Sequence, residues 1–315
     1  MPERIYVVIP CYNEEEVLPE TSRRLLLKLR ALIAAGEIDP GSRVMFVDDG
    51  SRDKTWAMIE RLSGEEDIFS GLRLSRNRGH QNALLAGLMA AKDRADISIS
   101  MDADLQDDVD IIDGFLAKRK EGCDVVYGVR SDRASDTAFK RMTAQGFYRL
   151  MKAFGVELIY NHADCRLMSR RALEGLSRYG EVNLFLRGIV PLIGYRTGVC
   201  AYERAERFAG ESKYPLKKML AFAFDGITSF SVRPLDFIRG LGLFITVISL
   251  IISVYSLFAR VFAWPFGGWG VLMGSLWFLS GLNLLALGLT GSYIGKIYAE
   301  TKRRPRYFVE ELLDD

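Results

Sequence analysis

The sequence predicts an α/β fold with a mostly parallel sheet, followed by two membrane-spanning helices. Strand-like and helix-like segments alternate four times over about the first hundred residues, a pattern typical of doubly wound sheets. Acidic residues come directly after three of the predicted strands, at the edge where such sheets bind ligands. Two long stretches without a charged residue lie in the last quarter of the chain.

The predicted elements follow one another without long gaps. Ile5–Ile9 is a continuous apolar run that ends at Pro10, as expected of a buried parallel strand. A helix is predicted from Asn13 to about Ala35, with acidic residues in its first turn, where the helix dipole favours them. The later elements are a strand over Arg43–Val47, a helix over Asp53–Leu62, a strand over Leu72–Leu74, a helix over Gln81–Lys92, and strands over Ile97–Met101 and Val125–Tyr127.

Composition excludes several function classes. The formal net charge of the 315 residues is +2, which is too balanced for a nucleic-acid-binding protein. The four cysteines show no C-x-x-C spacing and there are only two histidines, so a zinc site is not expected. We expect reduced, structural cysteines of a cytosolic compartment.

The two uncharged stretches predict membrane spans. Gly240–Ala259 and Val271–Ile294 are each long enough to cross a bilayer as a helix, and a buried core hairpin is the alternative. Arginines precede the first stretch and several lysines and arginines follow the second, so both termini are expected in the cytoplasm. Because a strand is predicted almost at once after Met1, no cleavable signal is expected. Residues 214–227 read equally well as an interfacial amphipathic helix or an ordinary surface helix, and their place before a span favours the first.

The pair Asp102 and Asp104 is the strongest chemical signal in the chain. Both follow the strand ending at Met101, so their carboxylates can reach one bound group. Mg²⁺ is typically held by one or two carboxylates and substrate phosphates. Taken alone, the pair could also be a solvated acidic loop. The chain has neither a G-x-G-x-x-G after its first strand nor a P-loop, so a metal would have to help bind phosphates.

Three acidic turns are predicted at one edge of the sheet: Pro10–Glu14, Val47–Ser51 and Asp102–Gln106. Because the carboxyl ends of parallel strands meet at the same edge, these turns are expected to form a nucleotide and metal site.

At this point the chain resembles the family 2 glycosyltransferases of GT-A fold, a Rossmann-like fold. Within them it is similar to the polyprenyl-phosphate glycosyltransferases, the bacterial bactoprenol glucosyltransferases more than the soluble dolichol-phosphate mannose synthases. The resemblance covers essentially the whole chain. The stretches that carry it are Val8–Glu14, Val47–Asp53, Arg76–Leu84, Met101–Gln106, Ala163–Arg170, Arg207–Lys213 and Gly291–Pro305.

The resemblance implies roles for residues in the three turns. It places Pro10, Tyr12 and Glu14 along the nucleotide pocket, Val47 and Asp49 at the base, Asp102 and Ala103 at the ribose and diphosphate, and Asp104 and Gln106, with Asp102, at a Mg²⁺ or Mn²⁺ ion. Asp49 could instead be only a turn residue before Gly50.

Three cations match the family's phosphate-binding residues: Arg130, Arg207 and Lys213. Ordinary solvated surface is the alternative. Phosphate binding is favoured because the reaction brings a sugar-nucleotide diphosphate close to a lipid phosphate. Two unit charges ~5 Å apart repel by about 3 kcal/mol at an effective dielectric of ~20, and cations offset this repulsion. Arginine suits this task, since its fork can hold two phosphate oxygens.

The resemblance implies three candidate catalytic residues: Asp164, Asp104 and Arg130. Asp164 stands where the family places a candidate catalytic carboxylate. A phosphate monoester has its second pKa near ~6 and is largely dianionic in the cytoplasm, so it needs no general base. We therefore expect Asp164 to orient the sugar or an arginine such as Arg166. A general base, or an N-cap of a helix over Arg166–Gly175, is the alternative.

The expected function is inverting transfer of a hexose from a nucleotide-sugar to a polyprenyl phosphate at the cytoplasmic face of the cell inner membrane. By resemblance the donor is UDP-glucose and the acceptor undecaprenyl phosphate. GDP-mannose or UDP-N-acetylglucosamine as donor, or a silent membrane-anchored nucleotide-binding subunit, are the alternatives. The small residues of the spans suggest a homo-oligomer. The expected parts are a catalytic domain over 1–213, a juxtamembrane segment over 214–235, two membrane helices within 236–296 (about 240–260 and 270–294) and a basic cytoplasmic tail over 297–315.

Overall fold

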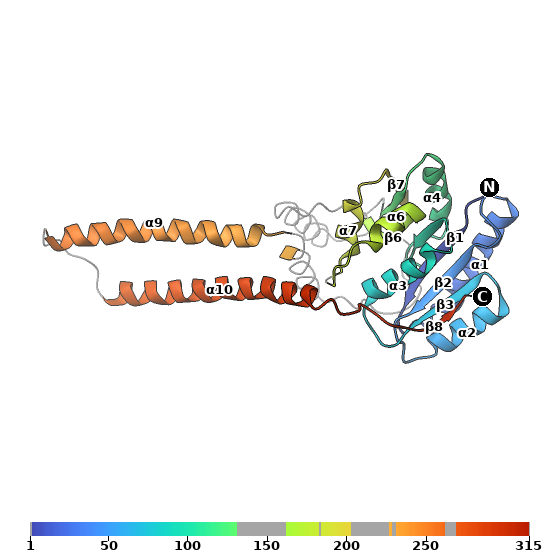
Figure 1. Cartoon of the computed structure of the whole chain (residues 1–315), viewed down its shortest axis with the longest axis horizontal. Coiled ribbons are helices and arrows are strands. Elements are labelled where there is room, and N and C mark those ends of the chain that lie inside the picture. Colours follow the sequence, from blue (N-terminus) through green and yellow to red (C-terminus); the bar gives the residue numbers. More distant parts are fainter. Residues whose placement is uncertain are drawn as a thin grey trace.

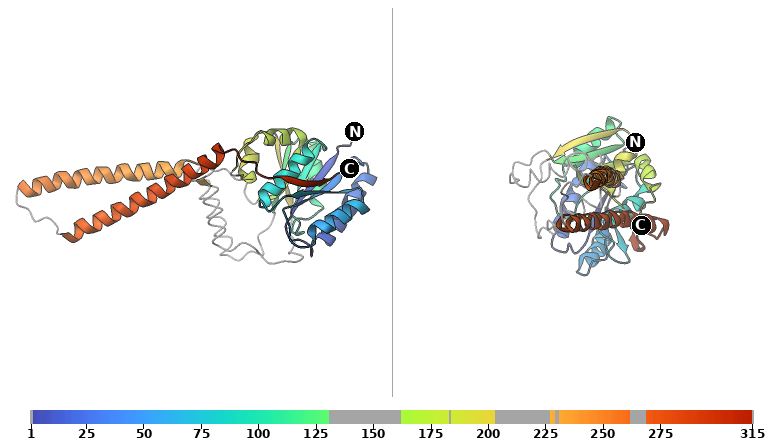
Figure 2. Two further views of the ribbon diagram at one scale, coloured as in Figure 1. Left: turned by 60° about the horizontal axis from the view of Figure 1, so that its bottom comes forward. Right: turned by 90° about the vertical axis from the view of Figure 1, so that its left-hand side faces the viewer.

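A computed structural model describes residues 2–130, 162–182, 184–202, 227–228, 231–261 and 269–314. An α/β domain carries both ends of the described chain, and two long helices extend away from one side of it (Figure 1). Figure 2 shows the same arrangement from two further directions. The α/β class expected from the sequence is confirmed.

Within the described residues the domain is built on one mixed sheet, with the strand order β7-β5-β6-β4-β1-β2-β3-β8. The strands are β1 (Ile5–Cys11), β2 (Arg43–Asp48), β3 (Phe69–Leu74), β4 (Ile97–Ser100), β5 (Val125–Arg130), β6 (His162–Ser169), β7 (Thr197–Tyr202) and β8 (Val309–Leu313). Strands β1 to β4 are parallel to their neighbours among these four, as the alternation of elements predicts.

Strand β6 is antiparallel to both of its neighbours, β4 and β5. Ile97 at the start of β4 pairs with Ser169 at the end of β6, and Ser100 pairs with Arg166. The amino-terminal end of β6 therefore lies at the same edge as the carboxyl ends of β1, β2 and β4. This pairing places Asp164 beside the acidic residues that follow β4.

Helices cover both faces of the sheet (Figure 1). The helices of the domain are α1 (Leu18–Ala34), α2 (Thr55–Glu65), α3 (His80–Lys92), α4 (Ile111–Lys120), α6 (Arg170–Ser177) and α7 (Leu186–Leu192). One hydrophobic core packs α1, α2 and α4 against the sheet, and a second packs α3, α6 and α7 against it. Burial on both faces explains why β1 reads as an unbroken apolar run.

Helix α1 begins at Leu18, five residues later than the sequence predicts. Asn13 has a left-handed backbone conformation, with φ of 54°, which a continuous helix cannot contain. The N–H of Asn13 donates to the hydroxyl of Ser51 (3.0 Å), and that of Glu14 to the hydroxyl of Thr55 (2.9 Å). The acidic residues Glu14, Glu15 and Glu16 therefore lie in the loop before α1, and not in the first helical turn where they were predicted.

Strand β8 was not predicted from the sequence, which assigned this region to a basic tail. It pairs antiparallel with β3 and closes that edge of the sheet. The side chain of the next residue, Asp314, is buried, and its carboxylate lies 2.7 Å from Nε of Arg94 and accepts a hydrogen bond from the hydroxyl of Tyr6 (3.1 Å). The end of the chain is therefore part of the α/β domain.

The two long helices are α9 (Arg233–Val261) and α10 (Trp269–Thr301). Within the described residues one segment, Ser275–Thr301, is long and apolar enough by length and composition to cross a membrane. Large apolar side chains stand exposed on both helices, for example Phe244 on α9 and Trp277 on α10. The prediction of two spans remains a prediction, and residues 214–226 of the expected interfacial segment lie outside the described residues.

Candidate active site

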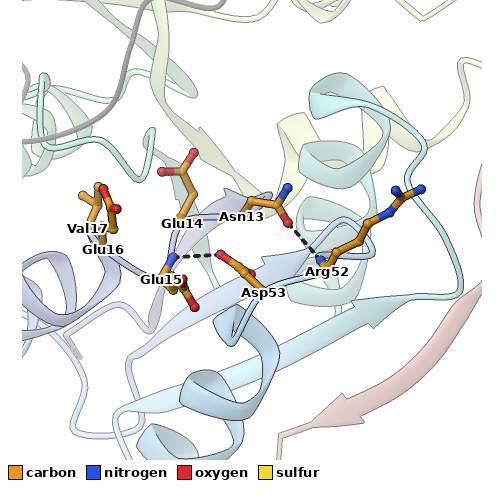
Figure 3. Close-up of a pocket in the computed structure, with 7 residues that line it drawn as sticks. All are labelled: Asn13, Glu14, Glu15, Glu16, Val17, Arg52 and Asp53. Atoms are coloured by element: carbon orange, nitrogen blue, oxygen red, sulfur yellow. Dashed lines mark hydrogen bonds between the residues drawn. The ribbon is translucent and has the colours of Figure 1, made fainter.

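The loops that follow β1 and β2 are joined by reciprocal hydrogen bonds. The amide oxygen of Asn13 accepts the N–H of Arg52 (2.9 Å), and the carboxylate of Asp53 accepts the N–H of Glu15 (3.2 Å). Both bonds are drawn in Figure 3. They border a pocket of about 430 Å³ whose lining is Asn13, Glu14, Glu15, Glu16, Val17, Arg52 and Asp53. The two loops thus form a preorganised, mainly acidic rim.

The residues expected to bind the nucleotide fall into two groups. Pro10 and Val47 are buried in β1 and β2, so their contribution to a ligand is limited to the backbone. Tyr12 is exposed and Glu14 is half-buried, both in the loop after β1. Glu14 also lines the pocket, where Figure 3 shows its carboxylate pointing away from the paired loop backbone.

Asp49 holds a third loop in place. Its carboxylate accepts the N–H groups of Arg78 (2.6 Å) and Gly79 (2.8 Å), just before α3 begins. Burial raises the pKa of this carboxyl, while the two N–H donors act to lower it. Gly50 packs so closely on this loop that a Cβ atom would lie 2.7 Å from Asn77 N. Asp49 therefore fixes the loop that leads into His80, a role that was not predicted from the sequence.

The acidic loop, Asp102–Gln106, follows β4 in a constrained conformation. Leu105 has φ of 57°, which costs a non-glycine residue on the order of 1–2 kcal/mol. The carboxylate of Asp104 accepts the N–H of Gln106 (3.2 Å), and the carbonyl of Ala103 accepts the hydroxyl of Thr21 (2.8 Å). These contacts fix the direction of the loop, as expected where side chains must be held for a ligand.

The acidic loop fits a divalent cation by its donor set. Burial raises the pKa of Asp102, His80 acts to lower it, and the carboxylates of Asp164 and Asp104 add to the rise. Within the described residues no group of three or more His, Cys, Asp or Glu side chains is placed to hold a metal. Two carboxylates and an amide from Gln106 match the sparse protein ligation of Mg²⁺, which takes its other ligands from substrate phosphates and water.

Asp164 sits in an arginine cluster, defined here as Asp164, Arg166 and Arg187. Arg166 donates to Asp164 Oδ1 (2.8 Å), and Arg187 donates through Nε to Oδ1 (3.0 Å) and through a terminal nitrogen to Oδ2 (2.8 Å). Burial alone would raise the pKa of Asp164, but the arginines, Arg187 foremost, and His80 hold it well below its usual range.

His80 joins the arginine cluster to the acidic loop. Its Nε2 atom lies 3.7 Å from Asp102 Oδ1 and 3.7 Å from Asp164 Oδ2. Burial alone would lower the pKa of this histidine, but the two carboxylates raise it. His80 lies in the stretch Arg76–Leu84 that carries the family resemblance, but no role was predicted for it. Its position as first residue of α3, after Gly79 with φ of 86°, is fixed by the long-range hydrogen bonds from Arg78 and Gly79 to Asp49.

Arg187 was also missed, and no motif or spacing in the sequence marks it. It lies in the seven-residue helix α7, which is short and bears a proline. The N-cap interpretation of Asp164 is wrong, because Asp164 lies within β6 and Ser169 caps α6, its hydroxyl accepting the N–H of Ala172 (3.2 Å).

The predicted phosphate-binding cations are not placed by the structure. The backbone of Arg130 ends β5 at the same edge as Asp164, and its side chain lies outside the described residues. Arg207 and Lys213 lie outside them as well. Of the predicted residues, the structure brings the loops of Tyr12, Glu14 and Asp49 to one edge with Asp102, Asp104 and Asp164.

The site thus has two ends of opposite charge on either side of His80. The acidic loop suits a cation and the groups that a cation binds, and the arginine cluster suits an anion. Asp164 is poorly suited to take a proton, because its oxygens are engaged by guanidinium groups and its pKa is depressed.

Comparison with known proteins agrees with the sequence motifs. Residues 6–177 match the family described as glycosyl transferase family 2. The chain is 53% identical to the protein named Uncharacterized glycosyltransferase YkoT of Bacillus subtilis (strain 168), over 96% of this chain and 90% of that one. It is 37% identical to a protein named Bactoprenol glucosyl transferase of Shigella phage SfV, over 98% of both. A solved mannosyl-3-phosphoglycerate synthase from Rubrobacter xylanophilus, 16% identical, gives a TM-score of 0.46 over 72% of this chain and 73% of that one.

Proposed function

The chain belongs to glycosyl transferase family 2, and from this premise we propose that it transfers a hexose from a nucleotide-sugar to a polyprenyl phosphate. The observation that carries the proposal is the pair of oppositely charged ends that meet at His80. A reaction between a diphosphate donor and a phosphate monoester acceptor needs two separate sites for anions, one of them suited to a bound cation. The relatives named bactoprenol glucosyl transferase support the lipid as acceptor.

The reaction is a substitution at the anomeric carbon of the sugar. An oxygen of the lipid phosphate forms a bond to that carbon, and the bond from the carbon to the nucleoside diphosphate breaks, with the electron pair leaving on the diphosphate. In-line attack inverts the configuration and gives a β-linked product from an α-linked donor. The attacking phosphate is dianionic near neutral pH, so no proton has to be removed from it.

The chain's own residues bind and orient the substrates. The loops after β1 and β2, which are joined by hydrogen bonds, bind the nucleoside together with Tyr12 and Glu14. Asp49 holds the loop before α3 beside them. Asp164, with its carboxylate engaged by arginines, orients and does not abstract a proton. This division leaves catalysis to positioning and electrostatic stabilisation.

A Mg²⁺ or Mn²⁺ ion completes the proposed site, held by Asp102, Asp104 and Gln106. When bound, it supplies positive charge that stabilises the departing diphosphate. The donor set supports this assignment, because two carboxylates and one amide oxygen stand within five residues of each other in one constrained loop.

UDP-glucose is the proposed donor and undecaprenyl phosphate the proposed acceptor. The name of the glucosyl transferase relatives supports the sugar, and the 37% identity extends over nearly the full length of both chains. GDP-mannose and UDP-N-acetylglucosamine are the competing donors, and the assay below separates them.

The proposed enzyme is anchored in the inner membrane by α9 and α10, with the α/β domain in the cytoplasm. The fold supports an even number of crossings, because β3 precedes the two helices and its sheet partner β8 follows them. The chain must therefore return to the side of the membrane from which it left. Only Ser275–Thr301 of the described residues passes the length and composition criterion, so the second crossing rests on this argument and on the charge-free stretch of α9. A homo-oligomer remains a prediction.

The proposal is tested by following radiolabelled sugar into organic-extractable lipid. The purified full chain is incubated with undecaprenyl phosphate, Mg²⁺ or Mn²⁺, and each of UDP-glucose, UDP-N-acetylglucosamine and GDP-mannose. We expect metal-dependent labelling from UDP-glucose. Labelling from another donor alone would correct the sugar, and nucleotide binding without labelled lipid from any donor would contradict the proposed reaction.

A further inference from the structure

The carboxylate of Asp164 is surrounded by two arginines that differ in their exposure. The side chain of Arg166 is 1% exposed, and a terminal nitrogen also donates to the carbonyl of Leu186 (3.4 Å). The side chain of Arg187 is 34% exposed while it holds both oxygens of Asp164. Arg166 is therefore placed to support the cluster from inside the domain, and Arg187 is the member that a ligand in solution can reach.

Helix α7, which carries Arg187, is fixed from two directions. The N–H of Leu186 donates to the amide oxygen of Gln81 in α3 (3.0 Å), so α7 is tied to the helix that begins with His80. In the loop before α7, the N–H of Val182 donates to the carboxylate of Glu300 in α10 (2.9 Å). The position of Arg187 is thus linked both to the site and to the end of a proposed membrane helix.

The arginine cluster lies on the side from which a lipid would arrive. Figure 1 shows α7 on the side of the α/β domain that faces α9 and α10. The contact between Val182 and Glu300 places the loop before α7 against the domain-proximal end of α10. The phosphate of a membrane lipid lies at the membrane surface, and α7 is on the side of the domain that faces the proposed spans.

Charge also separates the two ends. Two guanidinium groups surround one carboxylate, which leaves the arginine cluster with an excess of positive charge before His80 is counted. A phosphate monoester at neutral pH carries about two negative charges and three acceptor oxygens, and a guanidinium fork matches that geometry. The acidic loop would repel the same phosphate in the absence of a cation.

We propose that Arg187 binds the phosphate of the lipid acceptor and that Asp164 is a positioning residue that holds its guanidinium in place. The identity of the acceptor rests on the proposed function, whereas binding of a phosphate monoester rests on the geometry of the arginine cluster. From the sequence, Asp164 is expected to orient an arginine such as Arg166. Because Arg166 is buried and Arg187 is partly exposed, Arg187 is the arginine that can bind the ligand.

The test is calorimetric titration of the full chain in detergent micelles with farnesyl phosphate, farnesol, inorganic phosphate and UDP. We expect Arg187→Ala to weaken farnesyl phosphate binding about ten-fold or more and to change UDP binding less than about two-fold. Asp164→Asn should weaken farnesyl phosphate binding by a similar factor, and the double variant should be no weaker than Arg187→Ala alone, because both changes disable one guanidinium.

Arg171→Ala is the matched control. Arg171 is an exposed arginine on α6 that lies over the ring of Tyr195, and its loss should leave binding of both ligands unchanged. Arg187→Lys keeps the charge without the fork and should give an intermediate affinity, which provides a folded variant if the alanine change lowers the yield.

Three results would overturn the inference: wild-type affinity for farnesyl phosphate in a folded Arg187→Ala variant, equal losses for UDP and farnesyl phosphate, or farnesol binding as tightly as farnesyl phosphate. Inorganic phosphate that binds as tightly as farnesyl phosphate would overturn the assignment to a lipid. Binding of farnesyl phosphate through Arg187 without sugar transfer from any donor would support the inference and contradict the proposed function.

Discussion

The acidic loop and the arginine cluster face each other across His80, yet they are built in different ways. The acidic loop is a local turn after a parallel strand, and its two carboxylates are separated by one residue in the sequence. The arginine cluster joins β6 to α7 through groups more than twenty residues apart, and its Arg166 is buried. The first can be read from a motif, whereas the second exists only after the chain has folded.

This difference predicts that the two ends respond differently to substitution. A change in the acidic loop should alter the chemistry and leave the fold intact, because its carboxylates are partly exposed. A change at the buried Arg166 of the arginine cluster should alter the fold first.

Asp104→Asn should lower the rate of sugar transfer by about 100- to 1,000-fold, since it removes a charge directed at the metal and the leaving group. The melting temperature of the full chain should change by less than a few degrees. Asp108→Asn, an exposed neighbour in the same region, is the control and should keep nearly full activity. Equal losses in the two variants, measured with saturating metal, would remove the special role of the acidic loop.

Arg166→Met should lower the free energy of unfolding by about 3 kcal/mol, because it takes one partner from a buried ion pair. Arg187→Met should cost about 1 kcal/mol or less, since water screens its partly exposed side chain. Thermal unfolding of both variants in detergent compares them directly. If Arg187→Met were the more destabilising change, Arg187 would be a structural residue, and the proposed division within the cluster would be incorrect.

Each end of the site accepts a hydrogen bond from one hydroxyl group, so each end can be disturbed separately by removing that group. Thr21 donates to the carbonyl of Ala103 in the acidic loop, and Ser100 donates to the carbonyl of Asp164. Each bond contributes about 1 kcal/mol, which corresponds to roughly a five-fold effect. Thr21→Val should raise the KM for the nucleotide-sugar, and Ser100→Ala should raise the KM for the lipid phosphate. A shift in the same KM for both variants would show that the ends do not act on different substrates.

The shape of the pH profile of kcat should be the property least affected by substitution of Asp164. The depressed pKa of Asp164 keeps this carboxylate ionised throughout neutral and mildly acidic conditions, and its stabilising contribution is lost only as the pH falls through that low value. The fall in kcat below about pH 6 should therefore follow protonation of the lipid phosphate. Asp164→Asn should lower the rate and keep the shape of the profile between pH 5 and 8. Loss of the acid limb in this variant would identify Asp164 as a general base.

The same contrast shows what the sequence could predict. Local patterns predicted the parallel strands and the acidic turns after them, because each depends on a few consecutive residues. Strand β8 and the antiparallel position of β6 depend on pairing between distant segments, which no local pattern encodes. His80 and Arg187 were missed for that reason, since each acquires its neighbours through the packing of α3 and α7.

The central claim is that the acceptor is a phosphate monoester that attacks without a general base. Initial rates with undecaprenyl phosphate and with undecaprenol, at the same concentration in the same micelles, test it most directly when the lipid product is identified by mass spectrometry. We predict a hexosyl product from undecaprenyl phosphate and none from undecaprenol. A hexosyl product formed from undecaprenol at a comparable rate would contradict the account, because an alcohol needs a base that the engaged carboxylate of Asp164 is not placed to provide.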